Sequence, residues 1–181
     1  MRVVLGVIVT LLVAVPGRET FAAQTAPVKV SLVNGERQKV GEMTLTETPN
    51  GILIRLDLQA NPSGIAPGEH ALHIHDVGQC VPPFTLAGAH FNPAGKKHGF
   101  LEAQGRHTGD LPNIHVPANA ALTVEFLFTQ EPNGEKRRLL DADGFALVIH
   151  QSADDYRTDP AGNSGDRIAC GAVRSSSQSK K

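Results

Sequence analysis

Six of the eight histidines of this 181-residue chain lie between His70 and His107. Within this region, the segment ALHIHDVGQC places His73 and His75 two residues apart, between apolar neighbours. Side chains alternate between the two faces of a β-strand, so both imidazoles would leave one face and their apolar neighbours the other. A lone His-x-His pair is more often an ordinary surface feature than a metal site. Whether these two bind a metal therefore depends on further ligands elsewhere.

Further candidate ligands follow in the long segment HFNPAGKKHGFLEAQGRHTGD. Within 21 residues it supplies three imidazoles and a carboxylate as candidate ligands, namely His90, His98, His107 and Asp110. Three nitrogens and one oxygen suit a tetrahedral zinc site, which would also order a loop that has no core of its own. The alternative, four independent surface residues, accounts poorly for this clustering.

A second candidate set contains only imidazoles. The run FALVIH ends at His150, and His73, His75 and His90 could join it. Four imidazoles that leave one side open suit copper, which has the highest affinity among the divalent metals. If His90 serves both sets, each of its ring nitrogens holds one metal. Seven residues then provide two four-coordinate sites joined by one imidazolate.

The elements that must position these residues are mostly β-strands. Apolar and polar residues alternate over residues 28–32, 40–45, 52–58, 71–75, 122–128 and 145–150, and glycine, proline and asparagine clusters separate these runs. No stretch of helical period competes with them, so the fold class is all-β, a sandwich or barrel. Two long segments without periodicity, 76–119 and 151–169, are expected to be functional loops.

The start of the chain has the features of a secretory signal. Arg2 precedes an apolar run over residues 3–15, and residues 20–22 include small residues that suit cleavage. We expect a signal peptide at residues 1–22, one domain at residues 23–174 and a disordered tail at residues 175–181. The mature protein would be exported, to the periplasm or the extracellular space, without a transmembrane anchor. A form anchored by an uncleaved signal is the alternative.

Charge and cysteine content narrow the functional classes. Without residues 1–22 the formal net charge is −2, which argues against a nucleic-acid-binding protein. The only two cysteines, Cys80 and Cys170, are expected to form one disulfide, which an exported chain permits. Two free or metal-bound thiols are the alternative. A disulfide would close a ring of about 90 residues, worth on the order of 4 kcal/mol in the chain-entropy model.

Five segments closely resemble the copper-zinc superoxide dismutases, in particular their exported bacterial branch. They are HALHIHDVGQC, AGAHFNPAGKKHG, RHTGDLPN, IHQSADDY and GNSGDRIACG, and the resemblance covers residues 28 to about 174. It implies an eight-stranded Greek-key β-barrel with two long functional loops. It also implies an enzyme that converts two superoxide anions into dioxygen and hydrogen peroxide by copper redox cycling, while a zinc site organises the active-site loop.

The resemblance implies a role for each candidate residue. The copper ligands would be His73, His75, His90 and His150, and the zinc ligands would be His90, His98, His107 and Asp110. Asp154 would be the carboxylate that joins His73 to His98, and His70 would be structural. Cys80 and Cys170 would form the disulfide within one subunit. Arg167 would dock the superoxide anion beside copper, and His90 would carry a proton during catalysis.

The chain also departs from the family pattern. The stretch from Cys80 to His90 is longer than in the eukaryotic enzymes, and the second loop lacks the lysine that steers superoxide in many relatives. Lys96 and Lys97 could compensate. A metal-binding protein without turnover, such as a copper chaperone or a periplasmic metal buffer, and a secreted structural β-sandwich are the competing functions. The second has no use for this histidine spacing. The sequence leaves a monomer and a homodimer equally open.

Overall fold

The computed structural model describes residues 26–129, 139 and 142–174, so the expected signal peptide and tail lie outside the described residues. The strands, in chain order, are β1 (Val28–Asn34), β2 (Lys39–Thr48), β3 (Gly51–Leu58), β4 (Gly68–His70), β5 (Leu72–His75), β6 (Ile114–Val116), β7 (Leu122–Phe128), β8 (Phe145–His150) and β9 (Arg167–Val173). A single 3-10 turn, η1, spans Thr85–Ala87. Among the described residues, no helix is long and apolar enough to cross a membrane.

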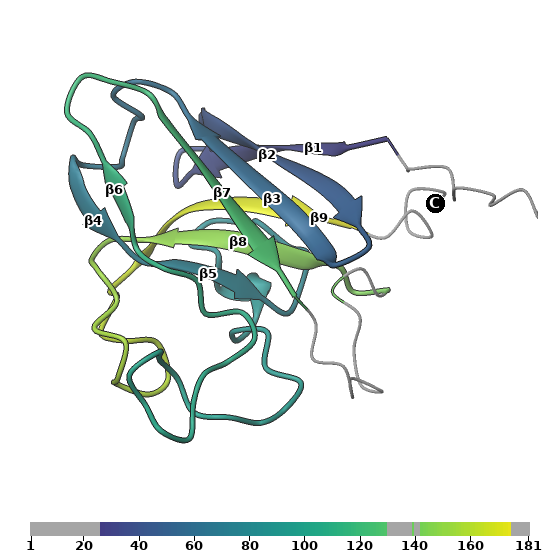
Figure 1. The fold of residues 1–181 in the computed structure, drawn as a ribbon. Coiled ribbons are helices and arrows are strands. Elements are labelled where there is room, and N and C mark those ends of the chain that lie inside the picture. The colour runs from purple at the N-terminus through teal and green to yellow at the C-terminus, as the bar shows by residue number, and fades with distance from the viewer. Residues whose placement is uncertain (1–25, 130–138, 140–141, 175–181) are drawn as a thin grey trace, which may run out of the picture.

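Seven of these strands form one strongly curled antiparallel sheet, in the order β5-β8-β9-β1-β2-β3-β7, and β4 pairs with β6 in a small second sheet (Figure 1). The predicted all-β class is therefore confirmed. The described residues contain nine strands where the resemblance implied eight, because the chain changes sheets at Ala71. The Ala71 N–H donates to the carbonyl oxygen of Ser152 at 2.8 Å, between β4 and β5.

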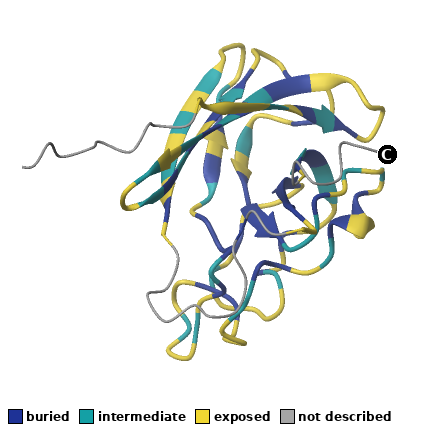
Figure 2. Cartoon of the chain, turned by 90° about the vertical axis from the view of Figure 1, so that its right-hand side faces the viewer, coloured by how far each residue is buried: buried dark blue, intermediate teal, exposed yellow. Residues whose placement is uncertain are grey.

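The main hydrophobic core lies inside the curl of the sheet (Figure 2). Strand alternation places it there, because successive side chains of a strand point to opposite faces. In β3, Ile54 and Leu56 are fully buried, whereas Arg55 between them is exposed. Burial of such side chains stabilises the fold by about 1.5–3 kcal/mol each. This core fixes the scaffold from which the candidate ligands project.

Strand β8 is buried on both faces, which sets it apart from the half-exposed strands. Its residues Phe145, Leu147 and Ile149 belong to the main core. On the other face, Ala146 and Val148 form a second cluster with Phe84, Ala87 and Cys170, under the loop that follows β5. Part of the first long loop is therefore supported by a small core of its own.

Two predicted boundaries are wrong. The second aperiodic segment was expected to extend to residue 169, but β9 begins at Arg167. Its central residues Ala169, Cys170 and Gly171 are all buried, so β9 shows no alternation that sequence could reveal. The first segment, 76–119, contains β6, which has only three residues. A strand that short gives too few positions for a periodic pattern.

Candidate metal centre

The candidate ligands lie on the face of β5 and β8 that points away from the main core. Leu72 and Ile74 of β5 are in the core, so His73 and His75 leave the opposite face, as the alternation predicts. The first loop runs back along this strand. The N–H of Ile74 donates to the carbonyl oxygen of Gly109 at 2.8 Å, and the N–H of Phe91 donates to the carbonyl oxygen of Ile74 at 2.8 Å. These bonds bring the loop histidines beside the strand histidines.

The first of two ligand sets contains only imidazoles. Ligand atoms from His73, His75, His90 and His150 all lie within 4.8 Å of one another, and all four residues are buried. One nitrogen of each ring is buried and has no hydrogen-bond partner, namely Nδ1 of His73 and Nε2 of the other three. An unsatisfied buried polar atom costs about 1–3 kcal/mol. Four such atoms around one point fit a bound metal ion, and an all-nitrogen set suits copper.

The second nitrogen of each strand histidine is held by an oxygen. His73 Nε2 lies 2.8 Å from Oδ2 of Asp154, His75 Nδ1 lies 3.0 Å from the carbonyl oxygen of Gly88, and His150 Nδ1 lies 3.2 Å from that of Gly165. These oxygens accept only, so each contacting nitrogen carries the ring proton. The unpartnered nitrogens are therefore left with lone pairs, which is the state a metal ligand needs.

The second set surrounds one carboxylate oxygen. Oδ1 of Asp110 lies 2.9 Å from Nδ1 of His90, 3.1 Å from Nδ1 of His98 and 3.2 Å from Nδ1 of His107. His107 Nδ1 and His90 Nδ1 are 3.3 Å apart. Four ligands at zinc-nitrogen distances on a tetrahedron would be about 3.3 Å apart. The three nitrogens and one oxygen predicted from sequence are therefore brought together at spacings that fit zinc.

His90 belongs to both sets, through different nitrogens. Its Nδ1 faces Asp110, whereas its Nε2 is one of the four unpartnered nitrogens of the all-imidazole set. One grouping around Asp110 whose ligand atoms all lie within 4.8 Å of one another takes in His73 instead of His107. We favour His107 as a member, because Nε2 of His73 is already bonded to Asp154 and its Nδ1 is one of the unpartnered nitrogens of the first set.

Asp110 and Asp154 hold the two sets from behind. Oδ2 of Asp110 accepts from the backbone N–H groups of Gly99 and His107, at 2.9 and 3.0 Å, so the carboxylate also anchors the loop. Asp154 stands between the sets: its Oδ2 contacts His73 Nε2, and its Oδ1 lies 3.0 Å from Nε2 of His98. The link from His73 to His98 that the resemblance implied is present in this geometry.

Burial keeps most imidazoles of the first set, which we call the copper set (His73, His75, His90 and His150), neutral; the set around Asp110 (His90, His98, His107 and Asp110) is called the zinc set. It lowers the pKa of His90 to about 4 and the pKa of His150 to about 3, and it holds the pKa of His75 well below its usual range. Burial alone would raise the pKa of Asp110. Hydrogen bonds from the surrounding histidines, His107 first, outweigh it and hold the pKa of Asp110 well below its ordinary value. Neutral imidazoles in the first set and an ionised carboxylate in the second are the protonation states in which these groups bind a divalent cation.

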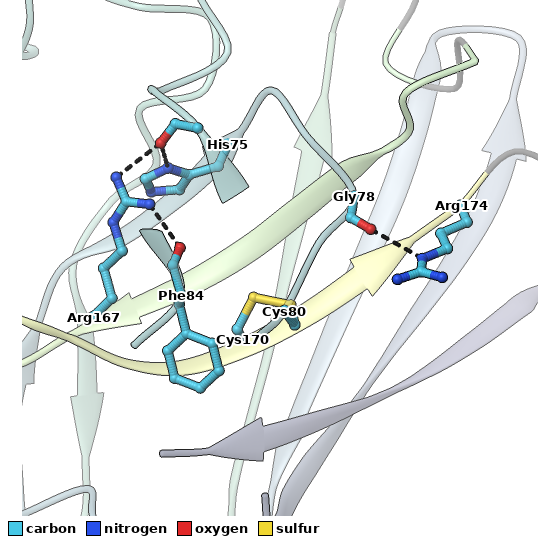
Figure 3. Close-up of a disulfide and its surroundings, with 8 residues drawn as sticks. His75, Gly78, Cys80, Phe84, Arg167, Cys170 and Arg174 are labelled. Atoms are coloured by element: carbon cyan, nitrogen blue, oxygen red, sulfur yellow. Dashed lines mark hydrogen bonds between the residues drawn. A yellow bond between two sulfur atoms is a disulfide. The ribbon is translucent and has the colours of Figure 1, made fainter. Parts of the chain in front are cut away.

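The loop after β5 holds Arg167 next to the copper set. The disulfide expected from sequence joins Cys80 in this loop to Cys170 in β9, with the Cα atoms 5.6 Å apart. Arg167 donates to the carbonyl oxygens of Phe84 and Gly88, both at 2.8 Å. Arg167 and His75 both bond to the carbonyl oxygen of Gly88, and Figure 3 shows the two side chains meeting at this one oxygen. The disulfide loop therefore orients a cation and a candidate ligand together.

Both sets border a cavity of about 670 Å³. Its lining includes His90, His107, His150 and Arg167, together with Lys96 and Asp159. A small anion entering here would meet the guanidinium of Arg167 beside the copper set. The cavity gives the otherwise buried histidines a route to solvent.

The remaining predicted residue, His70, belongs to neither set. Its Nδ1 and Nε2 each lie 2.8 Å from a carbonyl oxygen, those of His150 and Ala66. Sequence reasoning missed Phe84 and Gly88, which act through backbone carbonyls that any residue has. It also missed Ser164, a buried serine whose Oγ lies 3.1 Å from Nδ1 of His150. The positive φ of Gly88, which restricts the position to glycine, is the only trace these contacts leave in sequence.

Comparison with known proteins connects this geometry to one family. The family model described as copper/zinc superoxide dismutase matches residues 39–173. Superoxide dismutase [Cu-Zn] 2 of Aquifex aeolicus is 46% identical over 156 residues, which cover 84% of this chain and 89% of that protein. Superoxide dismutase [Cu-Zn] of Caulobacter vibrioides is 41% identical and covers 77% of this chain and 81% of its own length.

A solved structure agrees with the sequence comparisons. The crystal structure of a proline-to-histidine variant of a SOD-like protein from Bacillus subtilis aligns with a TM-score of 0.73 at 41% identity. The alignment covers 82% of this chain and 99% of that chain. The curled sheet, the two ligand sets and these matches lead to one conclusion: the chain belongs to the copper/zinc superoxide dismutase family.

Proposed function

We propose that this protein is a superoxide dismutase that uses one copper and one zinc ion. His73, His75, His90 and His150 would bind copper, and His90, His98, His107 and Asp110 would bind zinc. The observation that carries this proposal is the group of four buried, unpartnered imidazole nitrogens beside Arg167, in a cavity open to solvent. Copper bound there would supply a reversible one-electron change, accepting an electron from one superoxide and giving it to a second, which with two protons yields dioxygen and hydrogen peroxide.

The surrounding side chains bind and orient the substrate. Arg167 presents a fixed guanidinium to the cavity, because two carbonyl oxygens hold two of its nitrogens. A guanidinium offers charged hydrogen-bond donors to a small anion. Its position beside the copper set would hold superoxide within reach of electron transfer. In a mildly acidic protein, this local positive charge is what draws an anion to the site.

His90 is suited to move a proton. Its Nδ1 stays on the Asp110 side, whereas its Nε2 belongs to the copper set. We propose that Nε2 is the nitrogen of His90 that would hold copper and that would also carry a proton to the reduced substrate. His98, His107 and Asp110 would hold zinc, which has no redox chemistry, so that this half of the centre keeps His90 and its loop in place.

Export is the second part of the proposal. A signal peptide at residues 1–22 would direct the domain, residues 23–174, to the periplasm or the extracellular space. The Cys80–Cys170 disulfide supports this location, because disulfides persist in oxidising compartments. Mass spectrometry of the mature protein from a native host fraction would locate the cleavage point and test the assignment.

Family membership alone does not carry the activity, because one relative is named only a superoxide dismutase-like protein. A metal-binding protein without turnover is therefore the rival to be tested. The wild type should contain one copper and one zinc per chain and should disproportionate superoxide rapidly. Arg167→Glu should keep both metals but slow the reaction at least about tenfold, a barrier change of about 1.4 kcal/mol. Its melting temperature should fall only modestly, because two hydrogen bonds to the loop are lost.

Salt provides an independent check on Arg167. If attraction dominates, added salt should slow the wild type by screening, and Arg167→Glu should show a weaker or reversed dependence. Arg55→Glu, on the exposed outer face of β3, is the matched control and should behave like the wild type. Stoichiometric metals without dismutase activity in the wild type would favour the metal-binding rival. Equal rates and equal salt profiles for wild type and Arg167→Glu would remove Arg167 from the site.

A further inference from the structure

Asp159, in the loop between β8 and β9, contacts two of the proposed zinc ligands although it is not itself one of them. Oδ1 of Asp159 accepts a hydrogen bond from the backbone N–H of His98 at 2.9 Å. The same oxygen lies 3.9 Å from Nε2 of His107. Both histidines belong to the first loop, more than fifty positions earlier in the chain. Asp159 therefore faces two of the proposed zinc ligands without belonging to the ligand set.

This contact acts on the orientation of the ligands. The hydrogen bond to His98 fixes the backbone from which that ring leaves. His107 turns its Nδ1 toward Asp110, so a neutral ring in the ligand state carries its proton on Nε2, the end that faces Asp159. A distance of 3.9 Å is too long for a direct hydrogen bond, so the attraction there is electrostatic. Carboxylates placed behind metal-binding histidines commonly fix their orientation.

The same carboxylate also lies in the path of the substrate. Asp159 lines the 670 Å³ cavity together with Arg167 and Lys96, and its side chain is 52% exposed. A negative charge in this wall repels an approaching anion and offsets part of the attraction by Arg167. The location from which Asp159 holds the zinc ligands is therefore unfavourable for the entry of superoxide.

We propose that Asp159 is a positioning residue with two opposed effects: it clamps the zinc ligands His98 and His107, and it slows the entry of superoxide. The second effect rests on the proposed dismutase function, whereas the first requires only that the protein binds zinc. The two effects separate because the shorter contact of the clamp, the hydrogen bond from His98, needs only an oxygen as acceptor, whereas the repulsion uses the negative charge.

Two variants test this separation. Asp159→Asn keeps an oxygen that can accept from His98 but loses the charge, and Asp159→Ala loses both. Glu125→Gln is the matched control, because its side chain on β7 is also 52% exposed and lies outside the cavity lining. Zinc affinity is measured by chelator competition on copper-free protein. The rate with superoxide is measured on fully metallated protein at several ionic strengths.

We expect zinc affinity within about threefold of wild type for Asp159→Asn and at least about tenfold weaker for Asp159→Ala. Both variants, once fully loaded, should react about twofold faster at low ionic strength, and salt should remove the difference. Glu125→Gln should change neither quantity. Unchanged zinc affinity in Asp159→Ala would overturn the clamp, and unchanged rates in both variants would overturn the repulsion. A wild type without dismutase activity would overturn the proposed function and the second effect with it, while the chelator experiment would still decide the first.

Discussion

The two halves of the metal centre are built on different supports. Three of the four proposed copper ligands come from the adjacent strands β5 and β8, which are hydrogen-bonded to each other and packed on the main core. His98, His107 and Asp110, by contrast, lie outside the strands, in the stretch 92–110 of the first loop, which contributes no residue to either hydrophobic cluster. A strand site is formed before its metal arrives, whereas a loop site depends on its metal for order. We therefore expect the copper ligands to be in place before copper binds. The loop that carries the zinc ligands should become fully ordered only when zinc binds.

Removing a copper ligand should give the largest effect and leave the zinc half intact. His150→Ala takes one nitrogen from the all-imidazole set and none from the set around Asp110. Dismutase activity should fall at least about a hundredfold, because copper supplies the redox chemistry. Elemental analysis should show copper lost and zinc retained. His115→Ala, which removes an exposed histidine on β6, is the control. Stoichiometric copper in His150→Ala would refute the assignment.

Removing the carboxylate of Asp110 should weaken zinc binding and loosen the first loop before it affects copper binding. Asp110→Ala deletes the oxygen around which three histidines gather and leaves the N–H groups of Gly99 and His107 without their acceptor. Zinc affinity should fall at least about tenfold, and amide hydrogen exchange should quicken across residues 90–110. Asp110→Asn separates the two roles, since it keeps an acceptor but not the charge. Full zinc occupancy and unchanged melting in both variants would show that Asp110 is not a ligand.

Removing the Cys80–Cys170 disulfide should destabilise the fold and loosen the loop that holds Arg167 beside the copper ligands. Cys170→Ser opens a ring with a sequence separation of 90, and the loop-entropy model puts the loss at about 4 kcal/mol of unfolding free energy. The freed loop carries the carbonyls that hold Arg167, so activity should fall together with melting temperature. Cys80→Ser should match it. If wild type melts at the same temperature under reducing and oxidising conditions, the disulfide does not stabilise the fold.

Acid should destabilise the metal-free protein through the copper half. Burial lowers the pKa of His90 to about 4 and that of His150 to about 3, so the unfolded chain, with ordinary histidines near 6.5, binds protons first. The contribution of these two histidines to the free energy of unfolding is fully present above pH 6.5 and is lost as pH falls toward 4, by on the order of 3 kcal/mol per histidine. Hydrogen bonds raise the pKa of His98 to about 9 against its burial, so its contribution changes only at higher pH.

Denaturant unfolding of chelator-treated protein between pH 7.5 and 4.5 measures this loss. His150→Ala should show a shallower dependence by about one proton, because it removes one of the histidines that must be neutral in the fold. His115→Ala should keep the wild-type slope. Parallel slopes for wild type and His150→Ala would mean that burial of His150 does not govern acid stability.

Because the copper ligands lie mostly on strands and the zinc ligands lie in a loop, the sequence predicted the two groups of ligands in different ways. His73 and His75 were readable because strand alternation converts a two-residue spacing into a shared face, and His150 because it ends a clear strand. The loop ligands were readable only as a cluster of suitable residue types. Which nitrogen each ring uses depends on oxygens such as that of Gly165, which no pattern marks. Asp159 reads as one more solvated acid, because its partner, the N–H of His98, lies 61 residues away.

The shared oxygen of Gly88 has a consequence for anyone who would reshape this site. A side-chain substitution cannot remove that oxygen, so a mutational scan would report Gly88 through its positive φ and through a Cβ that runs into the carboxylate of Asp76. The intolerance would be attributed to backbone strain and crowding, although the carbonyl is what connects His75 and Arg167. Metal ligation and anion docking therefore cannot be tuned separately from this loop. Insertions or deletions between Cys80 and His90 would shift both at once, which makes loop length, and not residue identity, the effective handle for redesign.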